Sequence, residues 1–452
     1  MKKILIAVAA LGVFLTASAY FIGSTVEGRL KENFDNLATS SPNLSCTLKQ
    51  KHRGIFESSY TYTVDFTGPV AQGSDATPVR ISMDATYRVA HGPIPFAAMS
   101  FAPCLALADT TFTINPETDA DIREVFEKLP ELLQTTLHTR YGFDMGTSTD
   151  INMPPVAKSL AFADKPSLKL SWQGLSATVN VNSELSAYNM TFSAPGLAIQ
   201  DPAASVSFSG MSGGAEGKRI QGFVWSGNFH HLLQTLDVKP AAPGKPFAAH
   251  DLKLNLSLTP NGPVLDYALA VSGTGKLPGG STIPASLGMT FHSLDLAALN
   301  DLETVLHTKS PTPKAQPVSP EDFQRVATAM LKRSPWLEIR LSLMEGGEGP
   351  VQAQANLKTD QMKTLPDNIL LALTQLRAQA KLDAPEKTVL DLACLVMKEM
   401  GNAQPEAQCR AGITGQLDEF VSRGYLVRNG GQLTSEAVWN GLAVLLNGKP
   451  MQ

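Results

Sequence analysis

A serine stands at the centre of a short glycine-rich stretch, Gly210-Met211-Ser212-Gly213-Gly214, which matches the G-x-S-x-G spacing of hydrolase nucleophiles. In that motif a sharp turn between a strand and a helix exposes the serine hydroxyl and points helix amides at the oxyanion. The residues after Ser212, Gly213 to Gly217, begin helices poorly and form flexible β turns easily. We therefore expect no nucleophile at Ser212.

His230 and His231 are adjacent histidines, which raises the question of a metal site. Adjacent residues point to opposite faces of a strand and lie about 100° apart on a helix, so the two rings cannot simply hold one ion. The carboxylates are scattered, and the sequence contains no P-loop, dinucleotide fingerprint, H-E-x-x-H or EF-hand spacing. We predict no catalytic residue, no cofactor and no metal site.

The N-terminus begins Met1-Lys2-Lys3 and continues with twenty uncharged, mostly apolar residues, Ile4 to Gly23. A helix of that length reaches about 30 Å, the thickness of the hydrocarbon core of a bilayer. Cleavage after Ala17-Ser18-Ala19 would make the run a signal peptide, whereas its continuation past that site favours an uncleaved anchor. In both cases Lys2 and Lys3 stay in the cytoplasm and the rest of the chain is exported.

Four cysteines are present, Cys46, Cys104, Cys394 and Cys409, and none forms a C-x-x-C pair. An even number of cysteines in an oxidising compartment indicates disulfides. Three pairings are possible. Proximity in the sequence favours Cys394 with Cys409 and Cys46 with Cys104.

The composition excludes several classes of partner. The chain has 452 residues, of which 43% are hydrophobic and 17% charged, and its formal net charge is −4. No block rich in Lys and Arg is present, so a nucleic-acid partner is not expected. No second run approaches the length of a membrane span, so we expect a single pass.

Most of the exported part alternates in the manner of β-strands. Segments such as Leu168–Trp172, Ala177–Asn182, Asn189–Ser193 and Ser205–Phe208 follow one another, and the pattern resumes from Arg219 to Phe291. Short strands separated by small turns predict antiparallel meanders. In two places, after Asn228-Phe229 and after Asp295-Leu296, a strand leads into a helix-like segment.

The clearest soluble helix opens at Asn115-Pro116-Glu117 and carries an apolar stripe from Ile122 to Leu137, with Pro130 as a potential kink. Four prolines between Lys309 and Pro320 predict a linker or an exposed loop. We predict an α+β fold, mainly antiparallel β-sheet meanders with several covering helices, preceded by an N-terminal transmembrane helix. The predicted regions are an anchor (1–25), a β-rich periplasmic domain (26–309), a Pro-rich linker or loop (310–320) and a C-terminal α+β region (321–452).

Several short stretches carry a family resemblance. They are the Lys-Lys-led anchor, Arg53-Gly54-Ile55-Phe56-Glu57-Ser58-Ser59, His91-Gly92-Pro93-Ile94-Pro95, Phe420-Val421-Ser422-Arg423-Gly424-Tyr425-Leu426 and Leu446-Asn447-Gly448-Lys449-Pro450-Met451. With these marks at both ends, the chain resembles the YdgA-like family of exported bacterial proteins, a domain of unknown function. The resemblance implies a protein of the bacterial inner membrane with its bulk in the periplasm, and it brings no active site.

Two functional hypotheses remain. The first is a non-enzymatic binding or scaffolding module of the cell envelope, with a lipid-handling protein built on an apolar β trough as one version of it. The second is an envelope hydrolase with a dispersed active site. An apolar groove favours the first and a polar cleft with perturbed titratable groups the second. Expected partners are the inner membrane, through residues 4–23, and an envelope protein or lipid; a homo-oligomer is compatible with the sequence.

Overall fold

The computed structural model describes most of the chain after residue 17. The described residues are 18–32, 34–35, 43–69, 78–162, 165–222, 224–240, 245–276, 280–309, 319–343, 349–359, 362, 369–399, 401 and 404–451. Residues 1–17 of the predicted anchor and 310–318 of the predicted linker lie outside them. Within the described ranges, no helix is long and apolar enough to cross a membrane.

The chain forms two compact units. Unit 1 comprises Met1–Leu197, Gly214–Lys218 and Val305–Val318, and unit 2 comprises Ala198–Gly213, Arg219–Thr304 and Ser319–Gln452. Strand β11 (Ala204–Gln221) supplies residues to both units.

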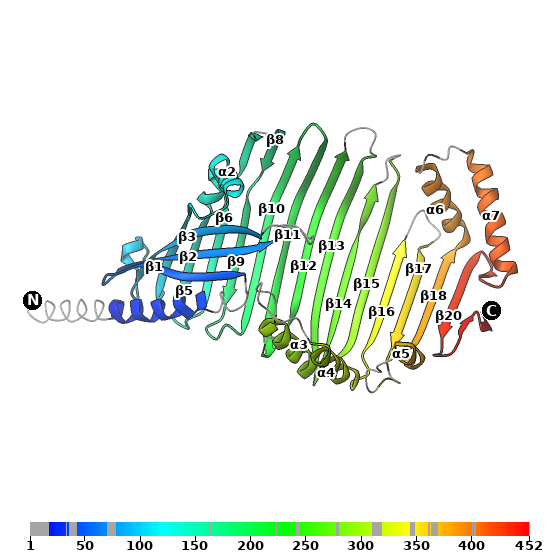
Figure 1. Cartoon of the computed structure of the whole chain (residues 1–452). Coiled ribbons are helices and arrows are strands. Elements are labelled where there is room, and N and C mark those ends of the chain that lie inside the picture. Colours follow the sequence, from blue (N-terminus) through cyan, green and yellow to red (C-terminus); the bar gives the residue numbers. More distant parts are fainter. Residues whose placement is uncertain are drawn as a thin grey trace, which may run out of the picture. The chain divides into compact units, whose positions relative to one another are not determined.

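Unit 1 is built on an antiparallel sheet (Figure 1). Its strands pair in the order β1 (Leu44–Arg53), β2 (Glu57–Pro69), β3 (Pro78–His91), β4 (Ala106–Ile114), β5 (Thr136–Tyr141), β6 (Thr147–Met153), β9 (Leu175–Val181) and β10 (Ala187–Gln200). A further hairpin joins β7 (Val156–Phe162) to β8 (Lys165–Trp172). The short 3-10 helix η1 (Phe96–Ala98) lies between β3 and β4.

A helix that begins the described chain, residues 18–35 with residue 33 left out, packs on the β1–β5 part of this sheet. Val26, Leu30 and Phe34 recur at helical spacing and are buried against Tyr60, Tyr62, Val89, Ala106, Ala108 and Tyr141. The ring of Phe34 stacks on that of Tyr62 with centroids 3.9 Å apart. The apolar side of this sheet region is therefore covered by the chain's own helix.

The helix expected from residue 115 to Leu137 is shorter than the sequence indicated. Helix α2 covers Ala120–Lys128, the 3-10 helix η2 covers Pro130–Gln134, and Leu137 belongs to β5. Pro130 lacks an amide hydrogen and clashes with the preceding turn, so it ends the α-helix rather than kinking it. The remaining stripe residues Val125, Leu129 and Leu132 pack on the β7–β8 hairpin.

Unit 2 is also an antiparallel sheet, in which neighbours in space follow the chain (Figure 1). Its order is β12 (Val224–Pro240), β13 (Phe247–Asn261), β14 (Val264–Lys276), β15 (Thr282–Asp295), β16 (Trp336–Leu343), β17 (Val351–Lys358), β18 (Arg377–Pro385) and β20 (Gln432–Trp439). Short strands β19 (Val427–Asn429) and β21 (Val444–Leu446) pair with the two ends of β20 on its edge away from β18, and β22 (Lys449–Pro450) pairs with β21. Leu232-Leu233, expected to begin a helix, lie inside β12.

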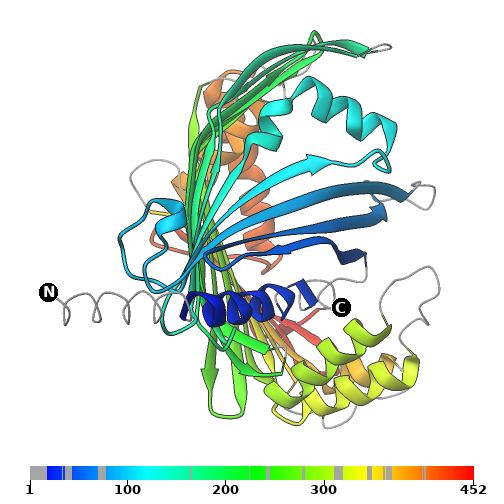
Figure 2. The ribbon, with the colours of Figure 1, turned by 90° about the vertical axis from the view of Figure 1, so that its left-hand side faces the viewer.

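Five helices accompany this sheet: α3 (Leu296–Lys309), α4 (Pro320–Leu331), α5 (Ile369–Gln375), α6 (Glu386–Glu399) and α7 (Glu406–Ser422). Leu296 of α3 packs on Leu258 and Leu265, and helices α6 and α7 pack on Leu433. Figure 2 shows both helical groups of unit 2 on the same side of its curved sheet. The predicted class, mainly antiparallel sheet with several helices, is confirmed.

Candidate functional site

The strand register of unit 2 lines up apolar side chains in rows that run across the sheet. Because side chains alternate between the two faces of a strand, residues that are register partners lie on the same face. Three successive rows share one face, and we call them the apolar rows. They are Leu254–Val271–Leu287–Leu341–Ala353–Leu382–Ser435, Leu256–Leu269–Met289–Ile339–Ala355–Ala380–Ala437 and Leu258–Tyr267–Phe291–Leu337–Leu357–Ala378–Trp439.

The opposite face of the same strands is polar. The row between the first two apolar rows reads Asn255–Ala270–Gly288–Arg340–Gln354–Lys381–Glu436. On this face Glu338 accepts hydrogen bonds from Arg340 at 2.9 Å and from Gln354 at 2.6 Å. The sheet is thus apolar on one side only, which is the pattern of a sheet whose second side faces water.

Among the described residues, no layer buries the apolar rows. From β13 to β18 not one of their residues is buried, and Leu287 is 43% exposed, Leu341 39% and Leu357 37%. Within the described residues, helices contact this face at its margins, at Leu258, at Leu433 and, through α5, at Trp439. A contiguous apolar surface of this kind in a folded protein marks a binding surface.

A groove is formed where the apolar rows change from large to small side chains. Its volume is about 220 Å³, and its lining includes Ala355, Ala378, Ala380 and Ala437 between Leu337, Leu357 and Trp439. Methyl side chains leave space that the neighbouring leucines and the indole do not fill. The Trp439 indole is fixed because its Nε1 donates to the Leu373 carbonyl at 3.0 Å. This arrangement supplies van der Waals contact and no charged group.

In unit 1 a serine and a histidine meet beneath the N-terminal helix. His91 Nε2 lies 2.9 Å from Ser58 Oγ, and His91 Nδ1 lies 2.9 Å from the carbonyl oxygen of Ala19. A carbonyl only accepts, so Nδ1 donates to Ala19, and the neutral ring accepts from the Ser58 hydroxyl through Nε2. Both side chains are 1% exposed, so no substrate reaches this pair. We interpret it as a latch that fastens the helix to the sheet.

Burial lowers the pKa of His91 below its usual value of 6.5, because it disfavours the imidazolium; the bond to Ala19 opposes this and the charge of Arg53 adds to it. Close packing surrounds the ring: a Cβ added to Gly23 would lie 2.7 Å from it. The neutral ring is the form that the Ser58 and Ala19 bonds require. The latch is therefore a structural feature with a pH dependence.

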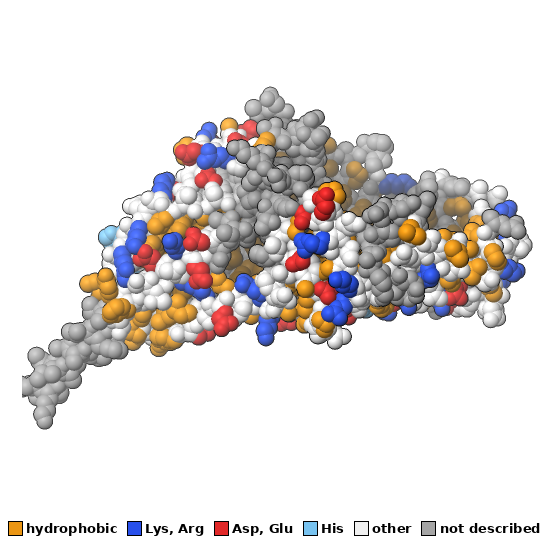
Figure 3. All heavy atoms as spheres, turned by 60° about the horizontal axis from the view of Figure 1, so that its bottom comes forward, with side chains coloured by type: hydrophobic (Ala, Val, Ile, Leu, Met, Phe, Trp, Pro, Cys, Tyr) orange, Lys and Arg blue, Asp and Glu red, His pale blue; other side chains and the backbone are white. Residues whose placement is uncertain are grey.

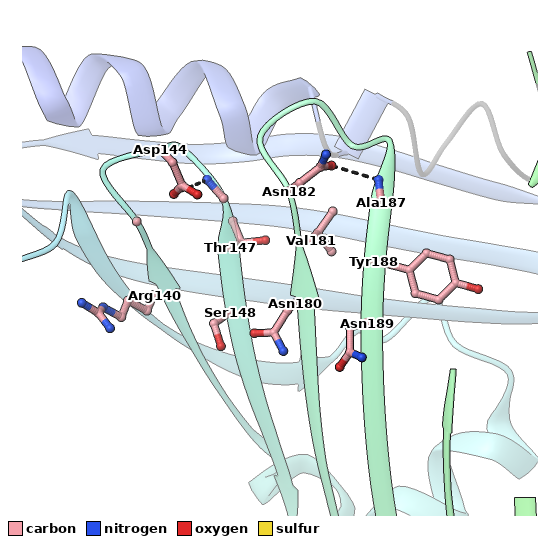
Figure 4. A pocket seen from close by; sticks show the side chains of 12 residues that line it. Arg140, Asp144, Thr147, Ser148, Asn180, Val181, Asn182, Ala187, Tyr188 and Asn189 are labelled. Carbon is pink, nitrogen blue, oxygen red and sulfur yellow. Dashed lines mark hydrogen bonds between the residues drawn. The ribbon is translucent and has the colours of Figure 1, made fainter. Parts of the chain in front are cut away.

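A polar depression of about 530 Å³ lies on unit 1 among β5, β6, β9 and β10 (Figure 4). Arg140, Ser148, Asn180 and Asn189 form one register row across it. The turn at its rim closes on itself, since Asp144 accepts from the Gly146 amide at 3.1 Å. Arg140 and Asp144 are both exposed, so this depression lacks the desolvation that prepares a group for acid-base chemistry.

The cysteines divide into a bridged pair and two thiols. Cys394 of α6 and Cys409 of α7 form a disulfide with Cα atoms 5.8 Å apart. Cys46 and Cys104 are free. Cys46 shares its register row with Ile114, whereas Cys104 precedes Ala106 at the other end of β4, about 27 Å along the strand. Burial raises the pKa of both thiols, which makes them poor nucleophiles.

The other chemical candidates lie within strands. Gly210 to Gly214 is part of β11, so no helix follows Ser212 and the geometry of a nucleophile elbow is missing. His230 and His231 lie in β12, opposite Asn255 and Leu254 respectively, and therefore point to opposite faces. In the part of the chain that the structure describes, no three His, Cys, Asp or Glu side chains are placed to share a metal ion.

The four described stretches that carried the family resemblance meet in pairs, at one junction in each unit. In unit 1 the His91 amide donates to the Phe56 carbonyl at 2.9 Å, beside the Ser58–His91 contact. In unit 2 the Asn447 side chain donates to the carbonyls of Gly424 at 2.8 Å and Tyr425 at 3.1 Å. Gly424 has a φ of 78°, which a residue ending a helix in the left-handed region needs. These stretches hold secondary structure together and do not line the apolar rows.

Sequence inspection missed the apolar rows as a unit. The alternation Leu252–Leu258 predicted a one-sided strand, but only the register shows that Leu256, Met289 and Ile339 lie in one row.

A family model described as a bacterial protein of unknown function (DUF945) matches residues 1–452. No curated protein and no solved structure matches the chain.

Proposed function

Starting from the fact that the chain belongs to the DUF945 family of bacterial proteins of unknown function, we propose that it binds lipid acyl chains on the apolar rows of unit 2 without catalysing a reaction. The observation that carries the proposal is an exposed face that is apolar in three consecutive rows across seven strands, apart from Ser435. The same strands are polar on their other face. Leaving one face apolar in water is unfavourable, so the difference between the two faces supports a ligand on the apolar one.

The dimensions of the rows fit a hydrocarbon chain. Strands lie about 4.8 Å apart, so a row from β13 to β20 extends about 29 Å. The hydrocarbon core of a bilayer is about 30 Å thick and contains two leaflets, so one acyl chain spans about 15 Å. One row is therefore long enough for a complete chain, and adjacent rows provide room for a second one.

The chemistry of the rows also suits an acyl chain better than a polar ligand. Each methylene removed from water contributes about 0.8 kcal/mol, so eight methylenes contribute about 6 kcal/mol before the cost of association is subtracted. The groove beside Trp439 offers apolar walls and no ionisable side chain. Hydrolysis has no comparable support, because the Ser58–His91 pair is sealed and Arg140 and Asp144 face solvent.

The proposal includes the finer assignments of family and location. The YdgA-like resemblance and the Ile4–Gly23 run support a single-pass protein of the bacterial inner membrane with both units in the periplasm. The buried Ala19 and its bond to His91 support an uncleaved N-terminus, since cleavage after Ala19 would cut the helix where the latch holds it. Mass spectrometry of the purified mature chain tests this clause, and a chain that starts at Tyr20 contradicts it.

Site-specific photocrosslinking tests the lipid site. A benzophenone amino acid replaces Leu341 in the full chain, and the matched control replaces Arg340, the preceding residue on the polar face. After irradiation in cells whose phospholipids carry radioactive phosphate, we expect label on the chain only with the probe at Leu341. The two positions share a strand and differ only in the face that they present.

Two results would overturn the lipid proposal. Equal labelling from Leu341 and Arg340 would show adventitious contact with membrane lipid. A protein adduct at Leu341 in place of lipid would identify these rows as a scaffold surface for an envelope protein, or for a second copy of the chain if the adduct has twice its mass.

A further inference from the structure

A second exposed apolar surface, at the start of the described chain, has no place in the acyl-chain site. The loop between β3 and β4 presents Phe96, Met99 and Phe101, of which Met99 is 87% exposed and Phe101 79%. The β1–β2 turn adds Ile55 and Phe56, and the N-terminal helix adds Tyr20 and Phe21, all exposed. We call these side chains the collar. Figure 3 shows hydrophobic side chains gathered around the point where the described chain begins.

Hydrogen bonds and close packing bring the three parts of the collar together. The His91 amide bonds to the Phe56 carbonyl, and a Cβ on Gly92 would lie 3.3 Å from that of Ala19. The Arg53 side chain donates to the Tyr20 carbonyl at 2.7 Å and lies 4.4 Å from the centre of the Tyr20 ring. The collar is therefore one surface assembled from separate parts of unit 1.

The loop is held in a shape that keeps its aromatic side chains outside. Pro95 and Cys104 are buried at its base, and Arg140 donates to the Pro103 carbonyl at 2.9 Å. The Met99 amide donates to the Phe96 carbonyl at 2.8 Å, and the Phe96 and Phe101 rings are 5.9 Å apart. No charged residue occurs from Gly92 to Ala108. Exposed aromatic side chains on a fixed, uncharged loop are typical of a surface that contacts a membrane or another protein.

We propose that the collar lies in the interfacial layer of a lipid bilayer, at the place where the N-terminal helix leaves it. The occupant follows from the sequence: residues 4–17 are uncharged and mostly apolar, and they join the chain directly at residue 18 beside the collar. Tyrosine and basic side chains such as Tyr20 and Arg53 are typical of the bilayer surface. The contact orients unit 1 on the membrane and does not depend on lipid binding by unit 2.

Spin-label accessibility tests the collar in the full chain, reconstituted in vesicles of phosphatidylethanolamine and phosphatidylglycerol. Nitroxide labels are placed at Met99→Cys and Phe101→Cys, with Thr67→Cys as control. Thr67 is exposed at the other end of β2 from Ser58, about 30 Å along the strand. The unsubstituted chain gives the background from Cys46 and Cys104.

We expect dissolved oxygen to relax the labels at 99 and 101 more than an aqueous nickel chelate does, and we expect the opposite ratio at 67. A nickel-dominated ratio at 99 and 101 would place the collar in water and overturn the proposal. Low accessibility to both reagents would place the collar against protein, which also overturns it. Vesicles with bromine-labelled lipid and a fluorescent label at the same cysteines provide an independent readout, in which quenching at 101 and none at 67 is expected.

Discussion

The two units of the chain differ in how far helices cover the apolar face of their sheets. Both have an antiparallel sheet with an apolar side, but in unit 1 the helix of residues 18–35 covers the β1–β5 region, whereas in unit 2 helices reach only the margins. Leu30 of the covering helix is 3% exposed, and Leu341 of the apolar rows is 39% exposed. A sheet side that a helix covers stabilises the fold, and one left open is available to a ligand.

Truncating one leucine in each unit should give the largest difference in stability between the two units. Leu30→Ala opens a cavity under the covering helix and should lower the free energy of unfolding by about 2–5 kcal/mol. Leu341→Ala removes a side chain that is already in contact with water, so the loss should stay below about 1 kcal/mol. Urea denaturation of the full chain, followed by circular dichroism, measures both. Equal losses would mean that the rows of unit 2 are a packed core after all.

At the margin of unit 2, the disulfide between α6 and α7 should stabilise the part of the sheet that helices do cover. Replacing Cys394 and Cys409 together by alanine should lower the free energy of unfolding by about 3 kcal/mol, because the bridge closes a loop with a sequence separation of 15. Cys46→Ala, which removes an unbridged thiol, is the control and should have a smaller effect. An unchanged urea midpoint in the double variant would argue against a stabilising bridge between α6 and α7.

The latch of unit 1 gives the third expectation. His91→Phe removes both ring hydrogen bonds and leaves the Ser58 hydroxyl and the Ala19 carbonyl buried without this partner, so the free energy of unfolding should fall by about 1–3 kcal/mol. Without these two hydrogen bonds, the N-terminal helix should be held less firmly on the unit 1 sheet. Hydrogen exchange of the amides of residues 20–32 measures the loosening, and unchanged protection would show that packing alone holds the helix.

The same histidine predicts a direction with pH. Since burial lowers the pKa of His91 in the folded state, the unfolded chain takes up the proton first as the pH falls through about 6.5, and stability decreases from there downward. Above that pH the contribution is fully present. Melting temperatures measured between pH 8 and pH 5 should fall below about pH 6.5 in the parent chain and fall less in His91→Phe. The exposed His52→Phe is the control, and a slope that His91→Phe leaves unchanged would rule out the latch as its source.

The smallest expected change in stability belongs to the open face. Leu287→Glu places a carboxylate among the apolar rows and should reduce copurifying lipid about tenfold or more, which corresponds to a loss of about 1.4 kcal/mol in binding. Its effect on folding should stay within about 0.5 kcal/mol, as for other exposed substitutions. The neighbouring Ser286→Glu, on the polar face, should leave lipid content unchanged. Equal lipid loss in both variants would remove the distinction between the faces.

The strands of unit 2 could be predicted from the sequence, whereas the apolar rows that they form together could not. Alternation in Leu252–Leu258 and Val264–Val271 is a local signal, because side-chain direction follows from a period of two. The row that joins Met289 to Ile339 depends on pairing across α3 and α4, which no local pattern reports. The candidate site therefore emerged only with the register.

The helix of unit 1 was predicted too long, and the contact between His91 and Ala19 was not predicted, both for physical reasons. The helix stripe to Leu137 counted apolar spacing and gave too little weight to Pro130, after which the chain becomes η2 and then β5. The contact between His91 and Ala19 joins residues that are 72 positions apart, and no local sequence pattern indicates it. The collar loop could have been found, since its run without charge from Gly92 to Ala108 is visible in the sequence.

From β12 to β18 each strand of unit 2 pairs with the one before it in the chain, and this order has a consequence for how such a protein changes size. Where each new strand pairs with the one before it, duplicating a hairpin would lengthen every apolar row by about 9.6 Å and leave the other strands in place. Inserting a single residue within a strand would instead exchange its two sides. Sheets of this type therefore grow by whole hairpins, and under the proposed function the number of strands would set the length of the acyl chain that fits across them.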